Sequence, residues 1–209
     1  MFATGSENLG PHQWRILARR IEELTADSEV DGVVVTHGTD TIEEAAFFLE
    51  LVCKSGKPVV LTGAMRPSTA LSADGPANLF QAVLAATSPQ LKSHGLLVVM
   101  NGLVIPGWQI IKTDSVALDS FHAYPGGPIG KIVGESLLVF GSPNLSPLVG
   151  RFHYHLRTDD ELPSVDIFIL HARCVVQPIA SLQGNACKCL VVAVFGGGTM
   201  PDNSHGRVA

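Results

Sequence analysis

Short apolar runs alternate with amphipathic segments of helical length over the first hundred residues, and this alternation constrains the fold more than any other feature. The apolar runs are rich in β-branched residues and occupy positions 30–35, 57–62 and 96–100. Helical periodicity marks residues 11–26, 41–53 and 75–87. Alternating strands and helices form parallel sheets covered on both faces. The pattern therefore predicts an α/β fold, a three-layer α/β/α arrangement with a mostly parallel sheet.

The pattern changes after residue 102. Short segments separated by turns follow and predict a small antiparallel extension, whereas residues 145–163, with several prolines and polar residues, predict a linker. Strands at 165–170 and 189–195, with a helix near 179–183, indicate that strand–helix alternation then resumes. We therefore expect an N-terminal α/β domain over 1–144, a linker over 145–163, and the start of a smaller C-terminal α/β domain over 164–209.

Both ends of the predicted fold lack an element that such folds contain. The first helix has no strand before it from which to cross over, and the strand ending near residue 195 has no helix after it. We therefore expect either a chain truncated at both ends, lacking the first strand of the sheet, or a partner chain that supplies the missing cover.

Composition excludes several classes of protein. A formal net charge of -5 without a basic stripe argues against a nucleic-acid partner, and no apolar run reaches the roughly 18 residues of a membrane span. Four cysteines are too few for a disulfide scaffold, and His153 and His155 have no third ligand nearby, so we expect no metal site. Since the first residues do not form a signal peptide, we expect a cytoplasmic location.

Polar residues gather where the predicted parallel strands end. Thr-His-Gly-Thr-Asp-Thr occupies 36–41, Thr-Gly-Ala-Met-Arg-Pro occupies 62–67, and Asn101-Gly102 follows the third strand, with Lys112 soon after. Ligands of open parallel sheets bind outside the carboxyl ends of the strands. Hydroxyls, a carboxylate and a lysine that meet there could activate a hydroxyl or a water for nucleophilic attack.

Each of these residues also has a structural interpretation. Asp40 and Glu43 have the spacing of a capping box for the helix that follows. Thr39 could serve as a turn hydroxyl, His37 could make a structural hydrogen bond, and Lys112 could be a solvated surface charge. Spacing alone therefore predicts an active-site edge and leaves the reaction open.

Taken together, these segments resemble one family. Residues 34–49, Val-Val-Thr-His-Gly-Thr-Asp-Thr-Ile-Glu-Glu-Ala-Ala-Phe-Phe-Leu, are similar to the second signature of the bacterial-type L-asparaginases. Leu-Thr-Gly-Ala-Met-Arg-Pro at 61–67 and Ser-Ala-Asp-Gly-Pro-Ala-Asn-Leu at 72–79 follow in the order and spacing of that family. The resemblance is strong over about 6–134 and weaker, in register, over about 166–201.

The resemblance implies hydrolysis of a side-chain amide, converting L-asparagine to L-aspartate and ammonia, with glutamine as a second substrate. It implies a catalytic Thr–Lys–Asp group at Thr39, Lys112 and Asp40. A neutral Lys112 amine would relay a proton from Thr39, and Asp40 would hold the lysine while binding the α-ammonium of the substrate.

The resemblance also implies a substrate-binding set. Ser6 and Glu7 match positions that contact the α-carboxylate and α-ammonium of the substrate, and Ala64 matches the backbone carbonyl that accepts the substrate amide. Thr39 and Asp40 complete this set. The family uses no cofactor, and its members form homo-oligomers, typically homotetramers.

The sequence departs from the family in one respect that bears on activity. No Thr-Gly-Gly-Thr loop, which carries the nucleophilic threonine of the family, occurs in these 209 residues. An impaired relative that binds an amino acid or a partner subunit is therefore the alternative, as is the amidotransferase subunit that shares these motifs. A dinucleotide site is weakly supported, because Gly196-Gly197-Gly198 lacks the G-x-G-x-x-G spacing.

Overall fold

A computed structural model describes residues 2–140, 148–153, 161–172 and 188–199, which fall into two compact units, 1–159 and 160–209. Parts of the predicted linker (145–147 and 154–160) and the predicted helix near 179–183 lie outside the described residues. The domain limits at 144 and 164 stay a prediction.

The helices of the first unit lie close to the predicted ranges. They are α1 (Pro11–Ala26), α2 (Ile42–Val52) and α3 (Gly75–Ala86), with short 3-10 turns η1 (Ser6–Asn8) and η2 (Pro89–Leu91). The strands are β1 (Val33–Thr36), β2 (Val59–Thr62), β3 (Leu96–Met100), β4 (Leu103–Pro106), β5 (Ile110–Lys112), β6 (Phe121–Ala123), β7 (Gly130–Val133) and β8 (Ser136–Val139). Among the described residues, no helix is long and apolar enough to cross a membrane.

Six strands form the central sheet, in the order β1-β2-β3-β4-β7-β8. β1, β2 and β3 are parallel, whereas β4, β7 and β8 continue the sheet in antiparallel pairs. The reversal occurs at Asn101-Gly102, where φ is 49° and 76°. Two successive positive φ values are typical of the tight hairpin turn that Asn-Gly favours. The sheet is thus parallel up to residue 100 and antiparallel after it, as the sequence pattern indicates.

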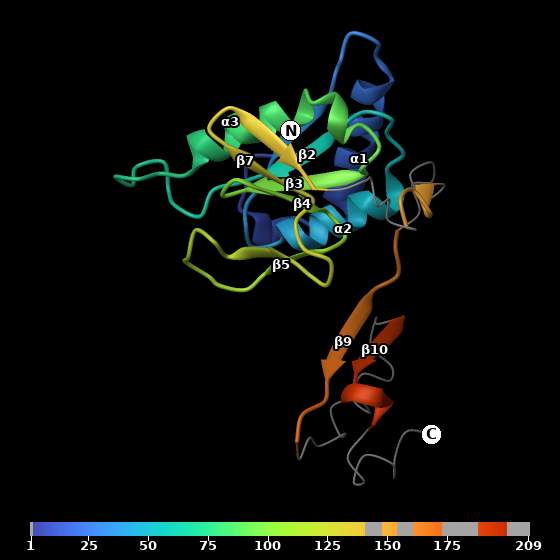
Figure 1. Cartoon of the computed structure of the whole chain (residues 1–209). Coiled ribbons are helices and arrows are strands. Elements are labelled where there is room, and N and C mark those ends of the chain that lie inside the picture. Colours follow the sequence, from blue (N-terminus) through green and yellow to red (C-terminus); the bar gives the residue numbers. More distant parts are fainter. Residues whose placement is uncertain (1, 141–147, 154–160, 173–187, 200–209) are drawn as a thin grey trace. The chain divides into compact units, whose positions relative to one another are not determined.

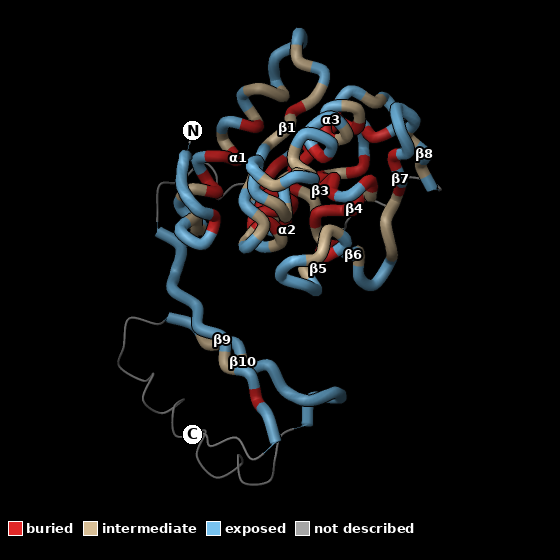
Figure 2. Tube along the Cα trace, turned by 90° about the vertical axis from the view of Figure 1, so that its left-hand side faces the viewer, coloured by how far each residue is buried: buried red, intermediate tan, exposed pale blue. Residues whose placement is uncertain are grey.

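Helices cover both faces of this sheet (Figure 1). On β3, Leu96, Val98 and Met100 pack into one core with α1 and α2, whereas Leu97 and Val99 pack into a second core with α3. This alternation follows from the two-residue period of a strand. All five β3 residues are buried, as the red trace in Figure 2 shows. The three-layer α/β/α prediction is confirmed for the first unit.

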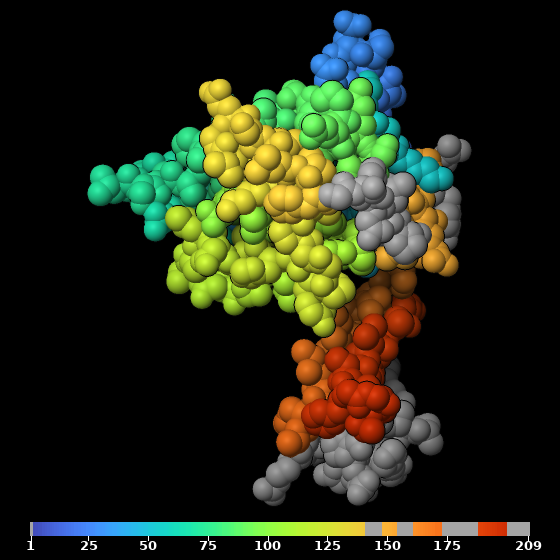
Figure 3. Space-filling view, viewed as in Figure 1, coloured from blue at the N-terminus to red at the C-terminus, as the bar shows by residue number. Residues whose placement is uncertain are grey.

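Two further features of the first unit lie beside the sheet. β5 and β6 form a separate hairpin whose Ile110 and Phe121 pack into the core of α1 and α2. The loop between β2 and α3 projects from the body of the unit (Figure 3), and Leu71 in it is exposed.

The second unit contains, among its described residues, the parallel pair β9 (Val165–Ile169) and β10 (Cys189–Ala193) and the short turn η4 (Gly196–Gly198). Both strands coincide with sequence-predicted strands.

Candidate active site

Close backbone approach brings three segments together beyond the end of β1. The N–H of His37 donates to the Thr62 carbonyl over 2.8 Å, which extends the pairing of β1 and β2. A Cβ added at Gly63 would lie 2.5 Å from the His37 carbonyl oxygen, and one at Gly38 would lie 2.6 Å from Ser6 Oγ. Both distances are too short for a side chain, so the loop requires glycine at these two positions.

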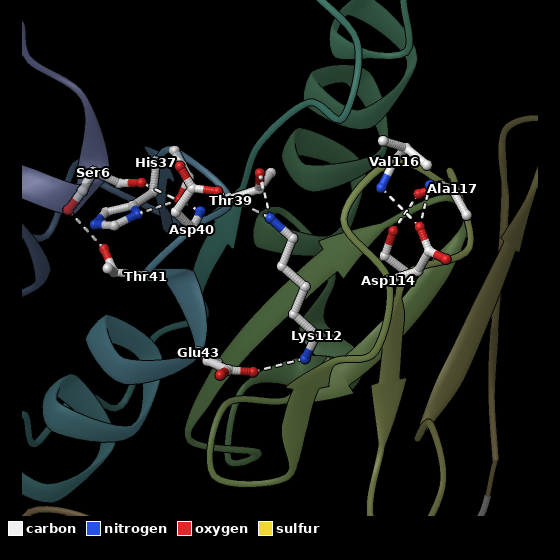
Figure 4. Close-up of polar contacts among 12 residues, drawn as sticks. Ser6, His37, Thr39, Asp40, Thr41, Glu43, Lys112, Asp114, Val116 and Ala117 are labelled. Atoms are coloured by element: carbon white, nitrogen blue, oxygen red, sulfur yellow. Dashed lines mark hydrogen bonds and ion pairs between the residues drawn. The ribbon is translucent and has the colours of Figure 1, made fainter.

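Lys112 reaches this loop from the end of β5 (Figure 4). Its Nζ lies 3.2 Å from Thr39 Oγ1 and 3.1 Å from Asp40 Oδ1. The lysine side chain is 16% exposed and that of Asp40 is 66% exposed. The structure therefore brings together the hydroxyl, the amine and the carboxylate that the sequence places 72 and 73 positions apart.

Ser6 joins the same loop from η1. It is buried, its Oγ accepts a hydrogen bond from the Asp40 N–H over 3.2 Å, and its carbonyl accepts one from Thr41 Oγ1 over 2.9 Å. Glu7 is exposed in the same turn, and its carboxylate accepts a hydrogen bond from Asn8 Nδ2 over 3.0 Å. Ser6 thus contacts the Asp40 loop directly, while Glu7 leaves its carboxylate in solvent.

Ala64 lies in a backbone segment that is held on both sides. The preceding carbonyl, of Gly63, accepts a hydrogen bond from Asn78 Nδ2 over 3.0 Å. The following N–H, of Met65, donates to Asp74 Oδ2 over 2.9 Å. A Cβ added at Gly75 would lie 3.4 Å from Ala64 Cβ, an ordinary van der Waals contact, so α3 begins directly beside Ala64.

Asp74 and Asn78 are structural members of this edge to which the sequence analysis gave no role. Asn78 is 2% exposed, and its Oδ1 accepts a hydrogen bond from the Asn101 N–H, so it connects the ends of β2 and β3. Burial by itself would raise the pKa of Asp74, but hydrogen bonds from the N–H groups of Met65 and Arg66 and from Asn78 lower it below its usual value. An Asp at a helix start with Asn four residues later is the signal that could have revealed this pair.

The start of α2 differs from the capping-box prediction. Thr41 occupies the N-cap position without a side-chain cap, and Asp40 Oδ1 accepts from Lys112 instead. The carboxylate of Glu43 accepts a hydrogen bond from the backbone N–H of Lys112 over 2.6 Å (Figure 4). The capping-box prediction is therefore wrong, since contacts with β5 use both acidic side chains.

His37 fits its structural interpretation. Its Nδ1 lies 2.8 Å from the Gly38 carbonyl oxygen, and its buried Nε2 has no hydrogen-bond partner among the described residues. Within the part of the chain that the structure describes, no three His, Cys, Asp or Glu side chains form a cluster suited to a metal ion. His155 lies outside the described residues.

Comparisons with known proteins assign this chain to a family. The model of the asparaginase N-terminal domain matches residues 1–145. The chain belongs to the asparaginase family. It is 39% identical over 198 residues to L-asparaginase 2 of Bacillus subtilis, covering 95% of this chain and 52% of that protein. It is 37% identical over 201 residues to L-asparaginase 2 of Escherichia coli, covering 94% of this chain and 56% of that protein.

A solved asparaginase shares the fold. The crystal structure of a probable cytoplasmic L-asparaginase from Campylobacter jejuni is 37% identical, with a TM-score of 0.81 over 95% of this chain and 63% of that one. The family and the α/β fold predicted from the sequence are thus confirmed. The chain spans about half the length of the curated asparaginases that it matches.

Proposed function

We propose that this asparaginase-family chain contributes the substrate-binding and proton-transfer part of an enzyme that hydrolyses L-asparagine to L-aspartate and ammonia. The observation that carries the proposal is the position of Lys112 Nζ, within hydrogen-bond distance of both Thr39 Oγ1 and Asp40 Oδ1. Glutamine is a second expected substrate, because one relative, from Pseudomonas fluorescens, is named glutaminase-asparaginase.

In the proposed reaction, an oxygen nucleophile adds to the amide carbon as its proton passes through the Thr39 hydroxyl to the Lys112 amine. The amine then gives this proton to the departing nitrogen, which leaves as ammonia. Water attacks the resulting acyl group along the same proton path and restores the nucleophile. One water is consumed, and the carboxylic acid and ammonia are the products. Asp40 keeps the amine beside Thr39 throughout.

Substrate binding uses the groups around this loop. The Asp40 side chain is 66% exposed, so its carboxylate is available to the α-ammonium of the substrate while it retains Lys112. The buried Ser6 hydroxyl and the Glu7 carboxylate lie in the adjoining turn and are proposed to bind the α-carboxylate and α-ammonium. The Ala64 carbonyl, which belongs to the peptide group whose Met65 N–H donates to Asp74, is proposed to accept the side-chain amide.

The test is ammonia release from asparagine and glutamine by three proteins: this chain, its Asp40→Asn variant, and the chain extended at its N-terminus with a Thr-Gly-Gly-Thr segment. Because the 209 residues contain no such motif, we expect aspartate binding but slow turnover, with activity rising by orders of magnitude on extension. Asp40→Asn should weaken aspartate binding, since the ammonium of the ligand loses its ionic partner. Full activity without the extension would instead identify Thr39 as the attacking residue.

The absence of the motif from this sequence also favours a second candidate, an amino-acid-binding or partner-binding relative, or an amidotransferase subunit. Aspartate binding without ammonia release, even in the extended protein, would support that alternative and contradict the enzyme proposal. A cytoplasmic location stays a prediction, because the relatives include a probable cytoplasmic asparaginase and a probable periplasmic one from Haemophilus influenzae.

We also infer that the chain forms a homo-oligomer. One face of the β9–β10 pair is apolar and exposed along its whole length, comprising Val165, Ile167, Ile169, Cys189, Val191 and Ala193. Contiguous exposed apolar surface is typical of protein contact sites.

A further inference from the structure

We propose that Glu43 is a positioning residue that fixes where Lys112 presents its amine, an inference that rests on the proposed function of the Thr39–Lys112–Asp40 group. The Glu43 carboxylate accepts the backbone N–H of Lys112 over 2.6 Å and so connects the first turn of α2 to the end of β5 (Figure 4). Among the described residues, Glu43 is the side chain that hydrogen-bonds the Lys112 backbone.

The contact uses a backbone group that the hairpin leaves available. β5 is a short strand whose only ladder partner among the described residues is β6, where Lys112 lies opposite Phe121. The next residue, Thr113, donates its N–H to the Ser120 carbonyl within the hairpin, whereas the N–H of Lys112 goes to Glu43. An N–H hydrogen bond to a carboxylate is stronger than one between neutral groups. Glu43 therefore docks this end of the hairpin onto α2.

Both ends of Lys112 are thereby fixed to the same short stretch of chain. Its backbone is held by Glu43, and its Nζ contacts Thr39 and Asp40, which lie four and three residues before Glu43. A lysine side chain has four rotatable bonds and loses much entropy when its amine is confined to one place. Anchoring the backbone limits the positions that the amine can take, which favours the geometry needed for proton transfer.

The position of Glu43 in α2 gives the proposal matched controls. Glu44 is the next residue, in the same first turn, and is exposed. Both acids lie in the first turn, near the positive end of the helix dipole, so Glu44→Ala removes a similar charge without removing a contact to the Lys112 backbone. Glu43→Gln keeps an acceptor oxygen at the same reach and loses the charge. Glu43→Asp keeps the charge but is one methylene shorter.

The experiment compares Glu43→Ala, Glu43→Asp, Glu43→Gln and Glu44→Ala in the extended protein that the activity test uses. We expect kcat for asparagine to fall about 10- to 100-fold in the Ala and Asp variants, with KM changed less than about threefold. Glu43→Gln should retain most of the parent kcat, and Glu44→Ala should have the same kcat as the parent. Equal losses in the Gln and Ala variants would show that charge matters rather than position, and would overturn the proposal.

A second measurement on the 209-residue chain does not depend on activity. Trace acetylation followed by mass spectrometry reports the reactivity of Lys112 relative to the exposed Lys92 of the same molecule. Glu43→Ala should raise the relative labelling of Lys112 several-fold, whereas Glu43→Gln and Glu44→Ala should not. Unchanged labelling in Glu43→Ala would refute the positioning role even if the enzyme proposal holds. Altered labelling in Glu43→Ala, together with an extended protein that releases no ammonia, would sustain the positioning role and contradict the proposed function alone.

Discussion

The parallel strands of the two units are built from the same kinds of residues but lie in opposite environments. In β3, Leu-Leu-Val-Val-Met, every residue is at most 4% exposed. In β10, Cys-Leu-Val-Val-Ala, no residue is buried, and in β9 Ile167 and Ile169 are 70% and 69% exposed. Figure 2 shows this contrast as red trace in β3 and mostly pale blue trace in β9 and β10.

Helices on the sheet faces account for the difference. Leu97 and Val99 of β3 pack with Ala82 and Ala85 of α3, whose small side chains let the helix approach closely. The other face of β3 packs against α1 and α2. A strand sequence therefore specifies strand formation, while its burial depends on helices elsewhere in the chain. The candidate active site belongs to the covered sheet, where buried polar side chains such as Asn78 find partners.

The largest effect that tests this comparison is a matched pair of isoleucine substitutions. Ile105→Ala in β4, where the isoleucine is 0% exposed, leaves a cavity and should lower the free energy of unfolding by about 2–5 kcal/mol. Ile167→Ala in β9, where it is 70% exposed, should change it by less than about 0.5 kcal/mol at concentrations low enough to keep the chain monomeric. Guanidinium unfolding followed by far-ultraviolet circular dichroism measures both. A loss of several kcal/mol in Ile167→Ala at such dilution would mean that other residues of the same chain cover β9, which would contradict the difference in burial between the two units.

The covered sheet also has a buried carboxylate beside it, on α2. Glu50 in α2 is 1% exposed, its Oε2 accepts the N–H of Leu96 over 2.7 Å, and its Oε1 has no partner among the described residues. Burial raises the pKa of Glu50 from 4.5 to about 7, and the hydrogen bond from Leu96 only partly opposes this. The folded chain thus holds a proton that the unfolded chain releases at a lower pH.

The free energy of unfolding should consequently fall as the pH rises from about 4.5 to about 7, and the full loss should be present above that range. Each tenfold change in an ionisation constant is worth about 1.4 kcal/mol, so ionised Glu50 costs about 3 kcal/mol. Glu50→Gln should remove this slope, and Asp166→Asn on the exposed strand β9 should retain it. Urea unfolding between pH 5 and 8, followed by fluorescence of Trp14 and Trp108, measures the difference. If the free energy of unfolding depended on pH in the same way in the parent and in Glu50→Gln, Glu50 would not be the group responsible.

Much of the fold could be predicted from the sequence because it depends on local pattern. Amphipathic periodicity predicts α1 over its observed range, and the short segments separated by turns after residue 102 predict an antiparallel extension. Burial of β9 could not be judged in this way, since its alternating apolar residues fit a covered face and an exposed one equally well.

The candidate site was harder than the fold to predict from sequence patterns. Contact between Lys112 and Asp40 spans 72 positions, so family resemblance rather than spacing indicated it. The acceptor role of Glu43 could not be foreseen, because the capping-box spacing offered a local partner, whereas the fold supplied a distant backbone N–H. Local patterns cannot decide between two such partners when one of them is brought near only by tertiary packing.

The smallest expected effect concerns the exposed face of β9 and β10. If a second copy covers this face, Val191→Thr buries a hydroxyl in the contact and should weaken self-association by about tenfold, or about 1.4 kcal/mol. Threonine keeps the β-branched shape, so β10 itself should persist. Val116→Thr is the control, because that valine is 77% exposed in the β5–β6 loop and undergoes the same chemical change. Light scattering over a micromolar concentration series measures both. A parent chain that stays monomeric throughout, or equal weakening by both substitutions, would show that the exposed face of the second unit does not hold copies together.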